Sequence, residues 1–418
     1  MKQKRFALQV PVLAILAVFA VSPVAGAELD HEPLARSANL SFEQVLQSAL
    51  DYAPEALAAE SRRAQADQYS AIASNWFSGA PTLATSYYDD NTMTSVGLKE
   101  LEAGLQFSLW RPGERGDARE LGNHYQQLYG AWRENLDLEI AGRLRRVIAD
   151  IELAEVLVTH ASDALQAKQE LLALTRVLFE AGDVSQLDVI QAETLMLQQQ
   201  NDLFAAEAAL VDGEREYEIL TGLRLLPASS FREQQSELEE IGADHALLKF
   251  VQANIDVAQS RVRLVKRTAT SSPTFGVGVR RERGAREDQY TDSLGLSFSI
   301  PLGRSGTANA AVSDARREAA DLEVALRRSQ LLLEQSLHEA EHSLFVTRQQ
   351  LAVSRQRSEL AEQRLQMARS AYELGETNLL AVTVALEDSL NSHKELHELE
   401  LMEQRLISEY NQSLGIMP

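Results

Sequence analysis

The chain has 418 residues, a formal net charge of −21 and no cysteine. Proteins that bind nucleic acid need basic patches to meet the phosphates, so this acidic balance argues against that class. Without cysteine the chain can form neither disulfides nor thiolate metal sites, and it offers no cysteine for a lipid anchor. A chain of this length can bury enough surface to fold without such cross-links.

The first 27 residues have the pattern of a secretory signal peptide. Two lysines and one arginine lie within the first five residues, an apolar stretch covers 7–21, and Ala25-Gly26-Ala27 supplies small residues for cleavage. We therefore expect residues 1–27 to be removed and the mature protein, which begins near Glu28, to leave the cytoplasm. A retained N-terminal anchor is the alternative, although the apolar stretch is short for a membrane-spanning helix.

Two segments of the chain are related at a constant offset of 193 residues. Residues 176–222 align without a gap on residues 369–415, and twelve of the 47 pairs are identical. The identical pairs include Glu180/Glu373, Gly182/Gly375, Leu187/Leu380, Val189/Val382, Ala192/Ala385, Tyr217/Tyr410 and Gly222/Gly415. Upstream, residues 81–83 match 273–275 and residues 104–109 match 295–300. Because the features follow the same order in both halves, we interpret the chain as two tandem copies of one unit.

Each copy is predicted to contain a helix, two strands, a very long helix, a tight turn and a shorter return helix. The first copy covers 41–222, with strands at 81–90 and 98–110, the long helix at 114–179 and the return helix at 184–221. The second covers 243–415, with strands at 273–282 and 292–301, the long helix at 305–373 and the return helix at 377–412. The remaining segments are an N-terminal extension at 28–40, a linker at 223–242 and the C-terminal end at 416–418.

Apolar and polar residues alternate along the predicted strands. One side carries Leu101, Ala103, Leu105, Phe107 and Leu109 in the first copy, and Leu294, Leu296, Phe298 and Ile300 in the second. Strands of about ten residues with one apolar face suit the wall of a transmembrane β-barrel, whereas half-buried hairpins of a soluble protein show the same alternation. Small barrels need about eight strands, so the four strands of one chain would have to share a barrel with other protomers.

The strand pairs are bounded by turn-forming and strand-breaking residues. Polar segments 89–95 and 282–292 are the expected hairpin loops. Trp110-Arg111-Pro112-Gly113 and Ile300-Pro301-Leu302-Gly303 occupy corresponding places after the strands. Proline removes a donor from the ladder and glycine permits a sharp change of direction, so both segments indicate a strand-to-helix turn.

The long helices have the apolar spacing of a left-handed coiled coil. In the first, a four-three spacing links Ile140, Leu144, Val147, Ile151, Ala154, Val158, Ala161 and Leu165. The second has Leu333, Leu337, Ala340, Leu344, Leu351, Ala361, Leu365, Ala368 and Tyr372. No proline interrupts either helix, and at 1.5 Å per residue each would reach roughly 100 Å.

Each long helix is predicted to end in a tight turn that leads into the return helix. The turns are residues 179–189 and 372–382, and each contains a glycine, Gly182 or Gly375, just past the helix. Glycine adopts the positive φ of a C-terminal cap at little cost. Asp183, Ser185, Thr377 and Asn378 can cap the returning helices. Each turn is therefore the tip of an α-helical hairpin.

These doubled tips resemble those of TolC-type outer-membrane efflux proteins. The shared pattern is an aromatic residue, a glycine three residues later, a polar residue, and a Leu-x-Val pattern that leads to an alanine. The resemblance implies an α+β membrane protein that forms a trimer, in which four strands per protomer build a 12-stranded transmembrane β-barrel above a long helical coiled-coil barrel. It also implies a place in the Gram-negative outer membrane, extending into the periplasm, with a periplasmic adaptor and an inner-membrane RND-type pump as partners.

The resemblance also implies roles for residues at the tips. Asp188 matches an acidic residue that narrows the closed periplasmic mouth, and since the second copy has Ala381 there, a trimer would carry a ring of three carboxylates. Such a ring would repel anions. The alternative is a solvated residue favoured by the dipole of the helix that it begins. We assign the gate to Asp188, Asp183 and Glu376, and adaptor docking to Gly182, Val184, Leu187, Gly375, Thr377 and Leu380.

One motif suggests an enzyme instead. Residues 338–342 satisfy H-E-x-x-H, in which two histidines one turn apart can hold zinc beside a glutamate base. His338 and His342 are expected to point outward from the middle of a coiled-coil helix, where no cleft would exclude water, so we keep them only as weak metal candidates. His393 and His397 form a second such pair. We therefore predict no catalytic residues, no cofactor and no enzyme activity.

The substrate is the least constrained property. The short acidic chain without a lipid anchor resembles the outer-membrane components of cobalt–zinc–cadmium (heavy-metal) resistance systems, so divalent cations are the expected cargo. Efflux of drugs or other organic solutes and type I protein secretion use the same architecture and stay open as alternatives. A soluble periplasmic coiled-coil scaffold is the alternative of a different class.

Overall fold

The computed structural model describes residues 33–228, 232–303 and 306–418. The signal-peptide prediction for 1–27, and the first part of the predicted extension at 28–40, lie outside these ranges. All helices and strands belong to one compact unit, residues 34–418. Within the described ranges, no helix combines the length and the apolarity needed to cross a membrane.

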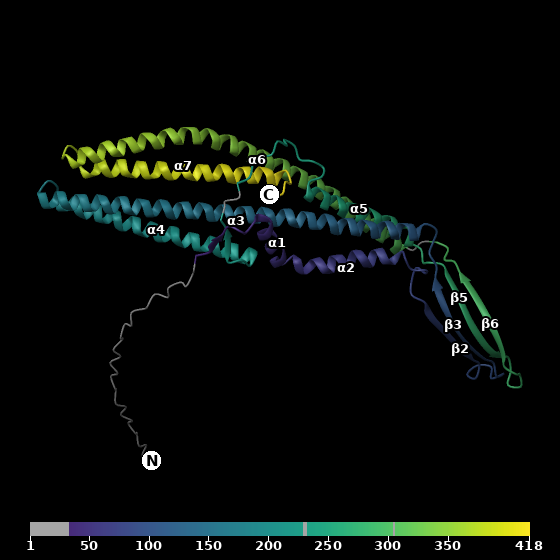
Figure 1. Ribbon diagram of the computed structural model, residues 1–418. Helices are drawn as coiled ribbons and strands as arrows, with labels where there is room; N and C mark the ends of the chain where they lie inside the picture. The colour runs from purple at the N-terminus through teal and green to yellow at the C-terminus, as the bar shows by residue number, and fades with distance from the viewer. Residues whose placement is uncertain (1–32, 229–231, 304–305) are drawn as a thin grey trace, which may run out of the picture. The chain divides into compact units, whose positions relative to one another are not determined.

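The helices and strands follow each other in two series (Figure 1). The helices are α1 (Phe42–Tyr52), α2 (Ala56–Ile72), α3 (Glu114–Ala181), α4 (Gln186–Thr221), α5 (Ala246–Thr268), α6 (Gly306–Glu373) and α7 (Leu379–Ser413). The strands are β1 (Ala35–Ser37), β2 (Thr82–Asp89), β3 (Lys99–Ser108), β4 (Leu225–Pro227), β5 (Thr274–Arg283) and β6 (Thr291–Ser299). The series α2-β2-β3-α3-α4 is thus followed by α5-β5-β6-α6-α7.

The helices form two long hairpins that lie side by side. α3 packs against α4, α6 packs against α7, and α3 also contacts α7, which gives the row α4–α3–α7–α6. Figure 1 shows the two hairpins with their tips at the same end. α2 and α5 pack on α3, and α5 packs on α6 as well. The first copy has two helices before its strands because Pro54 separates α1 from α2, a residue that cannot donate a helical hydrogen bond.

The predicted coiled-coil spacing is correct over much of both long helices. On α3, Ile140, Leu144, Val147, Ile151 and Ala154 are buried. Beyond them Val158, Ala161 and Leu165 are only half-buried, and the buried positions are Ala164, Lys168, Leu171, Leu172 and Thr175. A straight helix drifts against a seven-residue repeat, so the buried stripe shifts along a helix of 68 residues. On α6 the stripe is completed by polar residues, Thr347, Ser354 and Ser358.

The four long strands form one antiparallel sheet in the order β2-β3-β5-β6. The central pairing of β3 with β5 joins the two series, with Phe107 opposite Phe275 and Gly104 opposite Gly278. Because cross-strand partners share a face, this register puts the predicted apolar residues of all four strands on one side of the sheet. Among the described residues, β2 and β6 each have one edge without a partner strand.

A small second sheet ties the start of the chain to the linker. β1 pairs in parallel with β4, with Arg36 opposite Leu226. The Arg36 guanidinium donates to the Pro227 carbonyl at 2.8 Å and lies against the Glu155 carboxylate of α3 at 2.5 Å. These contacts fasten the N-terminal extension and the linker to the middle of α3.

Candidate functional site: the strand sheet and the hairpin tips

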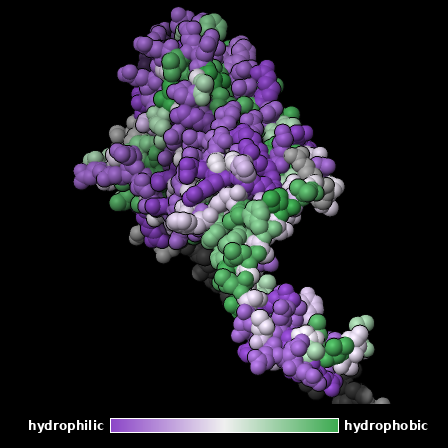
Figure 2. Space-filling view, turned by 90° about the vertical axis from the view of Figure 1, so that its right-hand side faces the viewer, coloured by the Kyte–Doolittle hydropathy of each residue, from purple (hydrophilic) through white to green (hydrophobic). Residues whose placement is uncertain are grey.

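The apolar face of the sheet is uncovered. Leu83 of β2 is 72% exposed and Leu294 of β6 is 73% exposed. Other exposed members of this face are Tyr87, Leu101, Leu105, Phe275, Val279, Leu296 and Phe298. Figure 2 shows the strands as a hydrophobic band between the hydrophilic helical body and a hydrophilic end. An apolar patch of this extent on a folded protein indicates an interaction with a membrane or another protein.

The opposite face is polar and lined by small residues at its centre. Ala84, Gly104, Gly278 and Gly295 form one row across the four strands. A Cβ atom at Gly104 would lie 2.8 Å from the Val277 carbonyl oxygen, so only glycine fits this close approach. A hollow of about 610 Å³ lies along this row. The sheet therefore separates a hydrophobic side from an open polar side.

Charged residues on the polar face lie toward the hairpin loops. The Arg280 guanidinium lies 2.7 Å from the Glu100 carboxylate and 3.6 Å from that of Glu102, and it also forms an ion pair with Glu282. Three carboxylates thus surround one guanidinium, which leaves this part of the polar face acidic. The surplus of negative charge lies where the sheet meets its loops.

The tip between α3 and α4 has the predicted caps. Gly182 ends α3 with a φ of +86°, and its N–H donates to the carbonyls of Leu178 and Phe179. Ser185 caps α4, and Asp188 completes a capping box by accepting from the Ser185 N–H at 2.9 Å and hydroxyl at 2.7 Å. Asp188 is half-exposed and fixed by these bonds, whereas Asp183 is exposed and does not cap.

The tip between α6 and α7 repeats this design with one change. Gly375 has a φ of +71°, and its N–H donates to the Tyr372 carbonyl at 3.0 Å. Asn378 caps α7 by accepting from the Ala381 N–H at 3.0 Å, while the predicted alternative cap, Thr377, does not. Ala381 lies where Asp188 lies in the first tip, so the second tip has no reciprocal carboxylate.

Both tips share one hydrophobic core and leave some apolar side chains exposed. Val184 packs partly buried against a cluster formed by both hairpins, which includes Leu172, Tyr372 and Val382. Leu187 is 71% exposed and its counterpart Leu380 is 59% exposed. The remaining predicted tip residues, Gly182, Gly375, Thr377 and Glu376, lie on the two turns. The tips thus have a packed apolar interior and two exposed leucine side chains on the outside.

Polar contacts between α3 and the second hairpin strengthen this end. Lys168, nearly buried on α3, donates to Gln199 of α4 at 2.9 Å and forms an ion pair with Glu387 of α7 at 2.7 Å. The Thr175 hydroxyl lies 3.4 Å from the hydroxyl of Tyr372, which is 2% exposed. The sequence did not indicate these partners, because they come from helices far apart along the chain.

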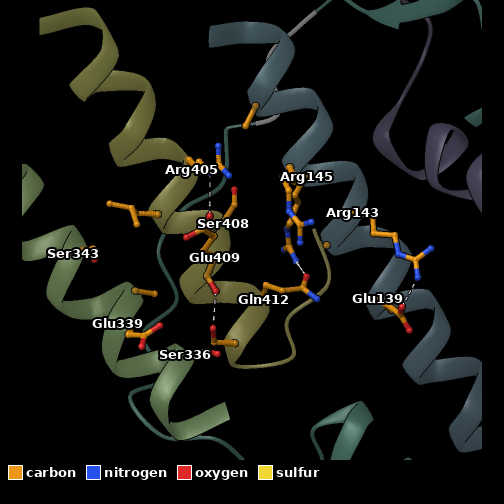
Figure 3. Close-up of a pocket in the computed structure, with 16 residues that line it drawn as sticks. Glu139, Arg143, Arg145, Ser336, Glu339, Ser343, Arg405, Ser408, Glu409 and Gln412 are labelled. Carbon is orange, nitrogen blue, oxygen red and sulfur yellow. Dashed lines mark hydrogen bonds and ion pairs between the residues drawn. The ribbon is translucent and has the colours of Figure 1, made fainter. Parts of the chain in front are cut away.

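A polar hollow of about 620 Å³ lies between α3, α6 and α7 (Figure 3). Arg145 forms two hydrogen bonds to Glu233 of the linker, at 2.6 and 2.7 Å, and another to Gln412 of α7. Arg405 pairs with Asp150 at 2.8 Å and with Glu409 at 3.0 Å. These arginines are engaged in holding the hairpins and the linker together, which is a structural role.

The two histidines of the H-E-x-x-H motif lie on the surface of α6. His338 and His342 are both exposed on α6, with ring centroids 6.2 Å apart. Among the described residues, no group of three or more histidine, aspartate or glutamate side chains is placed to hold a metal ion. His393 of the second pair lies 2.9 Å from its own helix carbonyl at Ser389, and His397 contacts His160 of α3.

Comparison with known proteins relates the chain to outer-membrane channels. Residues 238–410 match the family model described as outer membrane efflux protein. The matched residues run from just before α5 into α7 and so lie in the second series of elements. A comparison with curated protein sequences gives no match.

Solved structures of such channels share the fold of nearly the whole chain. CusC, whose crystal structures describe transmembrane channel formation, is 16% identical with a TM-score of 0.72, covering 90% of this chain and 92% of its own. The outer membrane protein VceC of Vibrio cholerae is 16% identical with a TM-score of 0.72, covering 89% and 95%. The CmeC outer membrane channel of Campylobacter jejuni is 15% identical with a TM-score of 0.71, covering 98% and 94%. The chain thus has the predicted α+β fold of outer-membrane efflux channels, and the matched family is not one of enzymes.

Proposed function

We propose that this chain is the protomer of an outer-membrane channel of a tripartite efflux system, with three copies enclosing one pore. The observation that carries the proposal is the sheet, which has one exposed apolar face, one open polar face and two unpaired edges. In lipid, each unsatisfied backbone group at such an edge costs several kcal/mol. The edges of β2 and β6 are therefore expected to pair with other copies, so that the apolar faces meet lipid and the polar faces enclose water.

The outer helices offer a second set of contacts between copies. α4 and α6 end the row of four helices, and both carry exposed apolar residues at seven-residue intervals. On α4 these are Ile190, Leu197 and Phe204; on α6 they are Val346, Val353, Leu360 and Met367, and Leu374 follows directly after its end. Seven-residue spacing is that of a coiled-coil contact. Since the two stripes differ, α4 of one copy would pack on α6 of the next, and such head-to-tail contacts close into a ring.

The tips are the proposed periplasmic end. In a trimer, Asp188, Asp183 and Glu376 would bring carboxylates to the mouth, where they repel anions. The exposed Leu187 and Leu380 would dock a periplasmic adaptor bound to an inner-membrane RND-type pump. The capping bonds of Asp188 support a fixed orientation of its carboxylate, which suits a defined constriction. We also propose that residues 1–27 are an export signal and that the two series are tandem copies.

Divalent heavy-metal cations are the proposed cargo, because the chain carries a net charge of −21 and the polar face of the sheet is acidic near its loops. Organic solutes are the second candidate and exported proteins the third. A soluble scaffold is disfavoured by the uncovered apolar face.

A strain lacking the gene tests both the proposed channel function and the proposed cargo. We expect it to become sensitive to zinc, cobalt or cadmium salts and to recover when the chain is supplied with its own pump and adaptor. Sensitivity to organic compounds alone would replace the proposed cargo and keep the channel. Purified protein that forms no trimer and conducts no ions across planar bilayers would contradict the channel itself.

A further inference from the structure

The apolar face of the sheet ends in a basic and aromatic margin on the loop side. This loop-side margin consists of Tyr87, Lys99, Arg281, Arg283 and Tyr290. Its strand residues share the face of Leu105 and Val279, since Lys99 is opposite Arg283 and Leu101 is opposite Arg281. The other end of the same face has Phe107, Phe275 and Phe298, and its strand residues include no lysine or arginine. The margin is therefore specific to one side of the apolar band.

Two guanidinium groups of the margin flank one aromatic ring. The Cζ atoms of Arg281 and Arg283 each lie 5.1 Å from the centre of the Tyr290 ring. Stacking on a ring orients a guanidinium group and leaves its N–H donors free to bind an anion at the edge. The Nε atom of Arg283 is buried and has no hydrogen-bond partner among the described residues. The contacts with the Tyr290 ring thus hold both guanidinium groups in place.

The carboxylates beside the margin compensate its positive charge only in part. Arg281 lies 3.5 Å from Asp292, and Lys99 lies 3.6 Å from Asp89, both distances longer than a strong charge-assisted bond. No carboxylate pairs with Arg283 in the described part of the chain. Arg280, one residue away on the opposite face, is instead surrounded by three carboxylates. The outward face at this level is basic and the inward face is acidic.

We propose that the loop-side margin binds the phosphate group of an anionic lipid in the outer leaflet. Arg281 and Arg283 would donate to the phosphate oxygens, a geometry that planar guanidinium groups favour, with Lys99 as an additional point charge. The acyl chains of that lipid would cover the apolar band below, and tyrosine suits the boundary between the two zones. This inference rests on the proposed membrane position of the sheet.

Native mass spectrometry of the purified full-length protein with lipid A, a diphosphorylated glycolipid, tests this binding. We expect the wild type to retain lipid A and the double variant R281Q/R283Q to bind it at least about tenfold more weakly, because charge-assisted bonds are lost. The matched control is R280Q, on the same strand but the opposite face, which should bind like the wild type. The charge-retaining variant R281K/R283K should bind with intermediate affinity.

Three further results separate the possible explanations. Equal binding of lipid A by R281Q/R283Q and the wild type would overturn the proposal, as would equal binding of dephosphorylated lipid A by the wild type. Displacement of lipid A by inorganic phosphate at millimolar concentration would show a free-phosphate site and overturn the lipid assignment. The same spectra report the oligomeric mass, so a trimer without lipid selectivity rejects only this inference, whereas absence of the trimer rejects the channel.

Discussion

His160 of α3 and His397 of α7 are in direct contact, with 2.7 Å between Nε2 of the first and Nδ1 of the second. The contact joins the two helical hairpins midway along their length, and the ring centroids are 4.9 Å apart. At this distance one imidazole must donate and the other must accept, so at least one ring of the pair is neutral. Double protonation would leave two donors facing each other.

This pair predicts a loss of stability in weak acid. Burial is the largest cause that lowers the pKa of His160 below its ordinary value of 6.5, and the charge of His397 is the second. The charges of His393 and Lys394 lower this pKa further, whereas the charge of Asp163 raises it. Arg232, Arg355 and Glu400 also line the surrounding hollow. Because the unfolded chain binds the proton more readily, stability is complete above pH 6.5 and falls as the pH drops from there to the lowered pKa.

Urea denaturation of the detergent-solubilised protein at a series of pH values measures this effect. We expect a slope well below the roughly 1.4 kcal/mol per pH unit of one full proton, because the site is partly solvated. H160Q should flatten the dependence in this window. H338Q, which changes an exposed histidine, should keep the wild-type dependence; an equal flattening by both would show that the contact is not responsible.

The close approach of α2 to α3 at Gly122 predicts opposite effects of two alanine substitutions. A Cβ atom at Gly122 would lie 2.7 Å from Ser70 Cα and 2.9 Å from the Tyr69 carbonyl oxygen, so G122A should destabilise the protein by about 1–3 kcal/mol. At Gly130, on the same helix, nothing lies within 4 Å of the added atom. G130A should therefore stabilise by about 0.5–1 kcal/mol. Denaturation midpoints that shift in the same direction would contradict the packing of α2.

The hydrogen-bond network around Arg145 predicts a large loss of stability when the charged group of this side chain is removed. Only 6% of the Arg145 side chain and 12% of the Glu233 side chain are exposed. R145M would leave the Glu233 carboxylate without its main partner, at a cost of about 3–5 kcal/mol. R348M breaks a more exposed pair, Arg348 with Glu403, and should cost less than about 1 kcal/mol. Unfolding free energies that fall equally in both variants would count against a special role for the buried network.

The positive φ of Gly182 predicts that transport and assembly can be separated. Valine at a φ of +86° is strained by about 1–3 kcal/mol, although nothing lies within 4 Å of the added Cβ atom, so only the turn should rearrange. We expect G182V to form trimers in the outer membrane and to lose efflux. G182N, which tolerates this conformation better, should retain efflux. Normal transport by G182V would contradict the assignment of this tip to the surface that docks the adaptor.

The sequence predicted those features that depend on local spacing. Alternation along 101–109 placed the apolar side chains correctly because every second residue of a strand shares a face. The C-terminal cap at Gly182 was predicted because glycine has a strong preference for that position, and the observed N-terminal cap, Ser185, was one of the two predicted candidates beside Asp183. Gly222 and Gly415, which the offset of 193 residues aligns, both have positive φ.

Contacts between segments far apart along the chain could not be predicted from the sequence. His160 and His397 are 237 positions apart, and nothing in their local pattern marks them as partners. β1 and β4 contain three residues each, too few to show an alternation. The four-three spacing predicted Val158 in the buried stripe, but it is only half-buried, since a fixed period cannot describe a helix that packs against both α4 and α7.

Disulfide cross-linking between the open edges tests most directly whether separate copies share one sheet. The chain has no native cysteine, so S86C on β2 can be combined with S293C or S297C on the same face of β6 without background. If β6 of one copy lies beside β2 of the next, oxidation in intact outer membranes should give covalent dimers and trimers with at least one pair, and nothing larger, because the ring closes. Each single-cysteine variant should stay monomeric on a denaturing gel. Monomers from every pair, in protein that resides in the membrane, would contradict the shared sheet.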